Sequence, residues 1–139
     1  MTGDGTGVAG LRAPSLDDID ALAEMAYAQL PASFRRLCQS LVIQVADFPD
    51  DETLDEMNAQ SEFDLLGLFR GRGIAHRGAV EETGELPNMI WLYRRPLLDY
   101  WCEGEDTLAA VVTHVLVHEI GHHFGLSDAD METIERSAR

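Results

Sequence analysis

The chain has 139 residues, which fits one domain of ordinary size and excludes two domains that each have a substantial core. Hydrophobic residues make up 45 % and charged residues 25 %, a globular composition that excludes wholesale disorder and allows a single packed core. The formal net charge is −15 and all ten basic residues are arginine, which argues against nucleic-acid binding and excludes chemistry that needs a lysine amine.

Residues 1–14 contain four glycines and one proline, which predicts a flexible tail before a single domain over residues 15–139. The same stretch lacks the positive region and apolar run of a signal peptide, so we expect a cytoplasmic protein. Apolar stretches elsewhere are a handful of residues long, whereas a membrane span takes about 20, so no membrane contact is expected. We interpret Cys38 and Cys102 as small buried residues with reduced thiols, with a disulfide as the alternative.

An amphipathic helix is predicted from Ser15 to about Pro31, because Ser15 can cap its first turn. Its apolar residues recur at intervals of three and four and are Leu16, Ile19, Leu22, Ala23 and Ala26. The same spacing predicts a second, short helix over residues 34–41.

Three apolar segments are predicted to be strands, at residues 41–46, 64–70 and 88–94. The acidic stretch 47–62 predicts a loop with a turn of helix. Residues 71–87 contain four glycines and one proline, and so long a connection predicts a functional or mobile loop. Pro96 is expected to end the third strand, before a short helix at residues 97–102.

The longest apolar periodic segment covers residues 105–124 and predicts a helix that is buried at the centre of the domain. Gly125 stands where a glycine commonly ends a helix, and a further helix is expected at residues 128–137.

The end of the buried helix reads His-Glu-x-x-His-x-x-Gly-x-x-Asp, starting at His118. Because His118 and His122 lie one helical turn apart, both imidazoles can reach one metal ion. Glu119 is rotated by about 100° from His118, so it can border the metal without ligating it, as a general base must. The composition of the chain gives about 0.015 chance matches to His-Glu-x-x-His, so chance is a poor explanation.

Asp128 is the candidate third ligand of a tetrahedral zinc site with an open position for water. A left-handed conformation at Gly125 would end the helix and bring Asp128 back beside His122. The alternative is that Asp128 caps the following helix, although Ser127, with Asp130 three residues on, could supply that cap instead.

The other histidines carry different expectations. We interpret His114, one turn before His118, as a core histidine with a hydrogen-bond partner, and a place beside a metal ligand is the alternative. His123 is expected at the helix end, and His76 in the long loop as an exposed residue.

Two further pairs of residues have side chains that suit the metal site. Glu132 and Glu135 follow His122 by 10 and 13 residues, which we take as too close for a separate return helix, so both rank below Asp128. Tyr93 and Tyr100 are candidates for stabilising an oxyanion.

These residues resemble the short bacterial zincin-like metallopeptidases, sometimes called minimal zincins, over most of residues 15–137. The most specific marker is the segment 115–128 with the metal motif, and supporting markers lie at residues 30–34, 42–49, 64–69 and 86–96. The resemblance implies the fold class α+β, a zincin core in which a small mixed sheet packs on the buried active-site helix. It implies zinc on His118, His122 and Asp128, and Glu119 as the base. It also implies that residues 88–94 form the strand that pairs with an extended peptide substrate.

The sequence therefore predicts a zinc-dependent metallopeptidase that hydrolyses peptide bonds in a peptide or small protein substrate, monomeric by default. The main alternative is a non-catalytic metal-binding interaction module on the same scaffold. A third hypothesis, a helical regulatory protein with an accidental motif, predicts no zinc at all.

Overall fold

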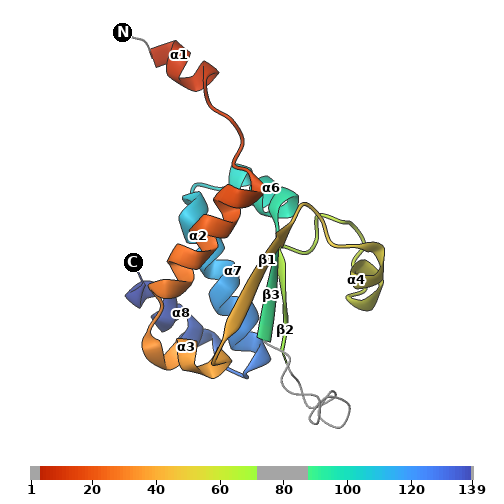
Figure 1. Cartoon of the computed structure of the whole chain (residues 1–139), viewed down its shortest axis with the longest axis vertical. Coiled ribbons are helices and arrows are strands. Elements are labelled where there is room, and N and C mark those ends of the chain that lie inside the picture. The colour runs from red at the N-terminus through yellow and green to blue at the C-terminus, as the bar shows by residue number, and fades with distance from the viewer. Residues whose placement is uncertain (1–3, 72–87, 139) are drawn as a thin grey trace.

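The computed structural model describes residues 4–71 and 88–138. Its helices and strands, in chain order, are α1 (Asp4–Ala9), α2 (Leu16–Ala28), α3 (Ala32–Cys38), β1 (Leu41–Ala46), α4 (Asp51–Glu56), β2 (Gly67–Arg70), β3 (Asn88–Tyr93), α6 (Arg94–Glu103), α7 (Leu108–His123) and α8 (Asp128–Ser137). Figure 1 shows α2 and α7 side by side against one face of the strands.

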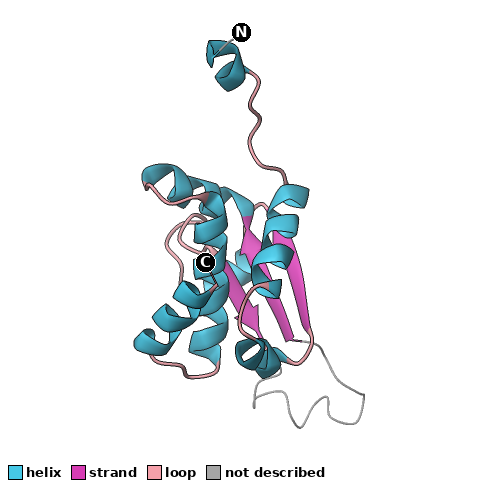
Figure 2. Ribbon diagram, turned by 90° about the vertical axis from the view of Figure 1, so that its left-hand side faces the viewer, coloured by secondary structure: helices cyan, strands magenta, loops and turns pink. Residues whose placement is uncertain are grey.

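The three strands form one mixed sheet in the order β1-β3-β2. Figure 2 shows the strands side by side, in magenta. Strand β1 runs parallel to β3, with Ile43 opposite Ile90, and β2 runs antiparallel to β3, with Phe69 opposite Ile90. The predicted α+β fold with a small mixed sheet on a buried helix is confirmed. Because β3 is the central strand and is paired on both sides, the expectation that residues 88–94 pair with a substrate is wrong.

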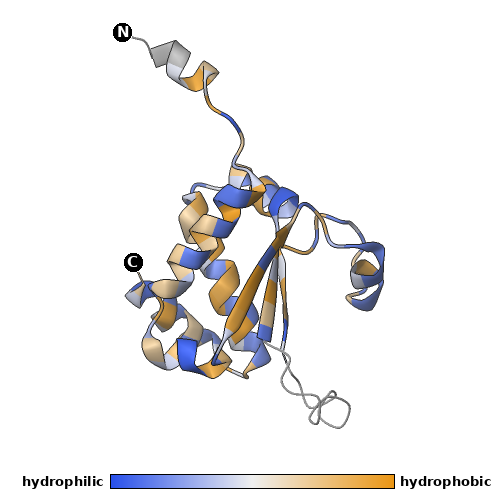
Figure 3. Ribbon diagram, viewed as in Figure 1, coloured by the Kyte–Doolittle hydropathy of each residue, from blue (hydrophilic) through white to orange (hydrophobic). Residues whose placement is uncertain are grey.

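Helix α7 forms the centre of the core and contacts α2, α6, α8, β2 and β3. Its buried side chains Val112 and Leu116 belong to the same cluster as Ile19 of α2 and Leu92 of β3. Figure 3 shows apolar residues gathered on α7 and the strands that face it, whereas α4 is largely hydrophilic. Because α7 is buried on most of its sides, its first turns are apolar almost all round and have no clear polar face.

Local signals explain where the helices begin. Ser15 accepts a hydrogen bond from the amide of Asp18, whose carboxylate accepts one from the amide of Ser15, so the predicted cap of α2 is confirmed as a capping box. Asp50 caps α4, the predicted turn of helix in the acidic stretch, and Thr107 caps α7.

Several predicted boundaries differ from the structure. The short helix expected at residues 34–41 is α3, which begins at Ala32 and ends at Cys38. Strand β2 begins only at Gly67, because the carboxylate of Asp64 accepts hydrogen bonds from the amides of Gln60 and Ser61 and so closes a turn. Helix α6 begins at Arg94, directly after β3, with Pro96 in its first turn, where a missing amide is harmless. The tail predicted at residues 1–14 contains helix α1, which projects away from the rest of the chain (Figure 1).

Both thiols are free and Cys38 is buried, as expected, but Cys102 is exposed, so the expectation that it is buried is wrong. Among the described residues, no helix has the length and hydrophobicity needed to cross a membrane. The predicted loop at residues 71–87 lies outside the described residues, apart from Gly71.

Candidate metal centre

Three histidines follow one another at intervals of one turn along α7. The ring centroids of His114 and His118 lie 4.0 Å apart, and those of His118 and His122 lie 5.7 Å apart with the rings nearly perpendicular. Burial of the valines and leucines on the other sides of α7 fixes this row of imidazoles on the side that stays accessible. The predicted pairing of His118 with His122 on one helix face is therefore present.

The chain reverses direction directly after α7. Gly125 has a φ of +78°, the left-handed conformation expected there. The amide of Leu126 donates to the carbonyl oxygen of Gly121 at 2.9 Å, and that of Gly125 donates to the carbonyl oxygen of His122 at 3.1 Å. These two bonds are a Schellman motif, which satisfies the last carbonyls of α7 and lets α8 return along it.

Asp128 is exposed and occupies the first position of α8. The cap of this helix is Ser127, whose hydroxyl accepts a hydrogen bond from the amide of Asp130 at 3.1 Å. The interpretation of Asp128 as the helix cap is therefore wrong, and the alternative with Ser127 and Asp130 is confirmed. Capping does not occupy the carboxylate of Asp128, which stays a predicted metal ligand.

Glu119 is partly buried between α7 and the edge strand β2. Burial raises the pKa of its carboxyl group above the ordinary value, and the nearby His122 and a hydrogen bond from the backbone amide of Phe69 oppose that rise. The Phe69 amide belongs to β2, so the carboxylate lies at the edge of the sheet as well as beside the histidines. Such a carboxylate can hold and release a proton next to a metal without being one of its ligands.

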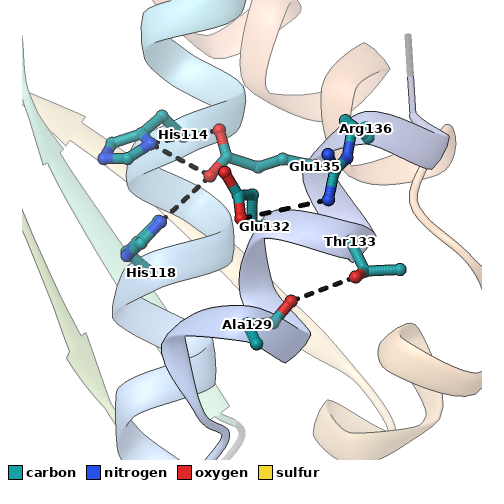
Figure 4. A network of polar contacts seen from close by, with 7 residues as sticks. All are labelled: His114, His118, Ala129, Glu132, Thr133, Glu135 and Arg136. Atoms are coloured by element: carbon teal, nitrogen blue, oxygen red, sulfur yellow. Dashed lines mark hydrogen bonds and ion pairs between the residues drawn. The ribbon is translucent and has the colours of Figure 1, made fainter.

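Glu135 is the residue of the site that sequence reasoning ranked too low. Because α8 runs back along α7, Oε1 of Glu135 lies 3.0 Å from Nε2 of His118, and both carboxylate oxygens lie 3.0 Å from Nδ1 of His114 (Figure 4). The four residues between α7 and α8 are enough for the chain to reverse direction and for α8 to run back along α7. The argument that Glu135 follows the motif too closely is therefore wrong. The helix predicted at residues 128–137 and the chain reversal expected at Gly125 could together have indicated that Glu135 lies near His118.

The described residues contain one group of three whose ligand atoms all lie within 4.8 Å of one another, and it consists of His114, His118 and Glu135. His122 and Asp128 are not part of this group. Two imidazole nitrogens and a carboxylate oxygen are donors that zinc accepts, so the chemistry of the side chains along α7 and α8 fits this metal.

The other candidates have different surroundings. The His114 side chain is 48 % exposed, so the interpretation as a core histidine is wrong and its place beside His118 is what the structure supports. His123 ends α7, as expected, and its ring packs on Phe69 with 4.5 Å between centroids. Tyr93 is buried at the end of β3, Tyr100 is exposed on α6, and His76 lies outside the described residues.

A cavity of about 550 Å³ lies on the other face of the sheet, and its lining includes Arg70, Trp91 and Tyr93 together with Glu52 and Glu56 of α4. Successive residues of a strand point to opposite faces, so Trp91 and Tyr93 point away from the core that Ile90 and Leu92 share with α7. None of the histidines of α7 lines this cavity. We place the chemistry at α7, because titratable groups of the right types converge there and cavity size alone assigns no reaction.

A protein family model matches most of the chain. Residues 38–138 match the family model described as zincin-like metallopeptidase, which covers β1 through α8 and so includes the whole sheet and the metal motif. No functionally curated protein matches the chain.

Proposed function

The chain belongs to the zincin-like metallopeptidase family, and from this premise we propose that it is a zinc-dependent peptidase that hydrolyses peptide bonds by using Glu119 as the general base. The observation that carries the proposal is the arrangement at the end of α7. His118 and His122 lie side by side, and Glu119 lies between His122 and the edge strand β2. This arrangement combines candidate metal ligands, a base and an edge strand in one place.

We propose that His118, His122 and Asp128 hold the catalytic zinc. The Schellman motif supports this assignment, because it reverses the chain within four residues. Helix α8 therefore begins at Asp128, shortly after the last turn of α7. When bound, zinc supplies a Lewis acid that polarises a carbonyl group and lowers the pKa of a water molecule to about 7.

The proposed role of Glu119 is to move one proton twice. Its carboxylate accepts a proton from the attacking water and then donates that proton to the nitrogen of the leaving amine. The hydrogen bond from the Phe69 amide fixes the orientation of the carboxylate, and partial burial makes it a better proton acceptor than a fully hydrated one.

The substrate main chain is expected to lie along β2. Among the described strands, β2 pairs only with β3, so it is an edge strand, the type of strand to which an extended peptide can pair. The contact between Glu119 and the Phe69 amide brings the proposed base to this strand. An extended peptide paired with β2 would have its backbone beside Glu119. Pairing with β1 would not place it there, and the central β3 is already paired on both sides.

The first experiment tests metal dependence. The purified protein is stripped with a chelator, assayed against a diverse peptide library, and assayed again after addition of one equivalent of zinc. We expect cleavage to vanish on stripping and return with zinc, and we expect His122→Ala to stay inactive at that zinc concentration. Replacement of the exposed His123, which packs on Phe69, by Ala is the matched control and should retain cleavage.

Stoichiometric zinc without any cleavage by the wild-type protein would overturn the peptidase and would favour the alternative, a metal-binding interaction module. A protein that binds no zinc would exclude both of these functions.

A further inference from the structure

We propose that His114, His118 and Glu135 form a second metal site, suited to zinc or a similar transition-metal ion, which shares His118 with the proposed catalytic ligands. The site is defined by its own three side chains, so it stands or falls independently of peptidase activity.

The distances between the ligand atoms fit a metal ion. Ligands about 2.0–2.2 Å from a tetrahedral zinc lie roughly 3.3 Å from one another. Here Oε1 of Glu135 lies 3.0 Å from Nε2 of His118 and 3.0 Å from Nδ1 of His114, and all three atoms lie within 4.8 Å of one another.

The positions of these side chains are set by packing between two helices. His114 and His118 are one turn apart on α7, and Glu135 reaches them from α8, as Figure 4 shows. Contact between α7 and α8 includes Met131, which is fully buried against Gly121. The ligands therefore sit on rigid elements, which favours a defined coordination geometry.

The carboxylate of Glu135 would be stabilised by a positively charged partner, and the side chains that contact it carry no permanent positive charge. Its side chain is only 14 % exposed, and a largely buried carboxylate is unfavourable unless it is paired. Its contacts are with two imidazoles, which carry charge only when protonated. Arg136, the adjacent cation, pairs with Glu132 at 3.9 Å instead (Figure 4). A bound cation would meet the need of Glu135 and use both imidazoles as neutral donors.

The surroundings of Glu135 are acidic as well. Glu135 lines a cavity of about 420 Å³ together with Glu105 and Asp106, whereas His114 and His118 do not line it. The chain as a whole carries a formal charge of −15. Both features raise the local concentration of divalent cations relative to bulk solution.

Sharing of His118 makes the two sites mutually exclusive. A neutral imidazole has a single nitrogen lone pair, so it binds one metal ion at a time. An ion held by His114 and Glu135 together with His118 therefore removes a ligand from the set that includes His122 and Asp128. The wild-type protein should bind one ion, distributed between two positions.

The test uses a protein in which the proposed catalytic ligands are removed. The double variant His122→Ala, Asp128→Asn is titrated with Co²⁺ and with Zn²⁺ by calorimetry and visible absorption. We expect one ion per chain. Addition of Glu135→Gln to this background should weaken binding at least about tenfold, because loss of a ligand costs no less than loss of a group that supports one. Glu132→Gln, on the exposed side of the same helix, is the matched control and should leave affinity unchanged.

A second route avoids reliance on Glu135, whose loss could disturb the helix pair. His114→Ala in the same double variant removes one half-exposed ligand and leaves the contact between Glu135 and His118 in place. It should also weaken binding at least about tenfold. If the double variant binds no metal, or if neither Glu135→Gln nor His114→Ala weakens binding, the cluster is a hydrogen-bonded contact between helices and the second site is refuted. Those outcomes would leave the peptidase proposal intact, since it rests on His122, Asp128 and Glu119.

Discussion

Met131 of α8 packs directly against Gly121 of α7, so closely that a β-carbon on Gly121 would lie only 2.8 Å from Cγ of Met131. Gly121 stands within the metal motif, between Glu119 and His122. Met131 is fully buried, so it cannot move into solvent to make room. The motif glycine thus sets how near α8 approaches α7, and with it the reach of Glu135 to His118.

Gly121→Ala is expected to destabilise the protein. Helix propensity alone favours alanine by about 1 kcal/mol, but overpacking of a full core costs about 1–3 kcal/mol and should prevail here. The free energy of unfolding, measured by urea titration, should fall. Gly104→Ala is the control, because a β-carbon there meets nothing within 4 Å, and its effect should stay within about 0.5 kcal/mol. A Gly121→Ala protein as stable as the wild type would show that α8 is not held against this glycine.

The two cysteines should react with thiol reagents at very different rates. Cys102 is exposed, whereas Cys38 is buried and burial raises the pKa of its thiol. The thiolate is the reactive form, so Cys38 is protected both by access and by protonation. Labelling of the native protein should modify one thiol quickly, and Cys102→Ser should abolish that phase. Rapid labelling of Cys102→Ser without denaturant would contradict the burial of Cys38.

Stability should fall in alkaline solution, and Tyr27 should contribute to the fall. Its hydroxyl donates to the carbonyl oxygen of Arg35 at 3.2 Å, and burial raises its pKa well above the ordinary value of 10. The folded protein therefore keeps a proton that the unfolded chain releases above about pH 10, so the free energy of unfolding decreases as pH rises through that range. The chain has no lysine to titrate in the same window.

Tyr27→Phe tests this assignment. It should lower stability by about 1 kcal/mol near pH 8, through loss of the hydrogen bond, but reduce the decline between pH 9.5 and 11.5. Tyr100→Phe, at an exposed position on α6, is the matched control. Equal declines in the wild type and Tyr27→Phe would exclude a contribution from Tyr27.

If the protein cleaves peptides, its negative charge should make it cleave basic peptides faster than acidic ones. A formal charge of −15 attracts cationic substrates over distances of about a Debye length. Matched basic and acidic peptides with the same cleavage sequence should differ in kcat/KM at low salt, with the basic one faster. The difference should shrink at high salt, and a difference insensitive to salt would point to direct contacts instead.

Much of the site could be predicted from local patterns, because these depend on neighbours in the sequence. The helix spacing of His118 and His122, the left-handed Gly125 and the Ser127 cap all follow from rules that span at most a few residues. Strand order could not be obtained in this way, since pairing of β3 with both β1 and β2 joins distant segments. Glu135 was undervalued for the same reason. Its role depends on the angle at which α8 packs on α7, which Met131 and Gly121 determine in three dimensions.

The central claim is that Glu119 is the base of a zinc peptidase. The most direct test compares kcat/KM of the zinc-loaded wild type and Glu119→Gln on one cleaved peptide, with Glu24→Gln, an exposed glutamate on α2, as control. We expect Glu119→Gln to bind zinc as the wild type does and to lose at least about 100-fold in kcat/KM, the contribution typical of a general base. Equal rates in the wild type and Glu119→Gln, at equal zinc content, would contradict the account.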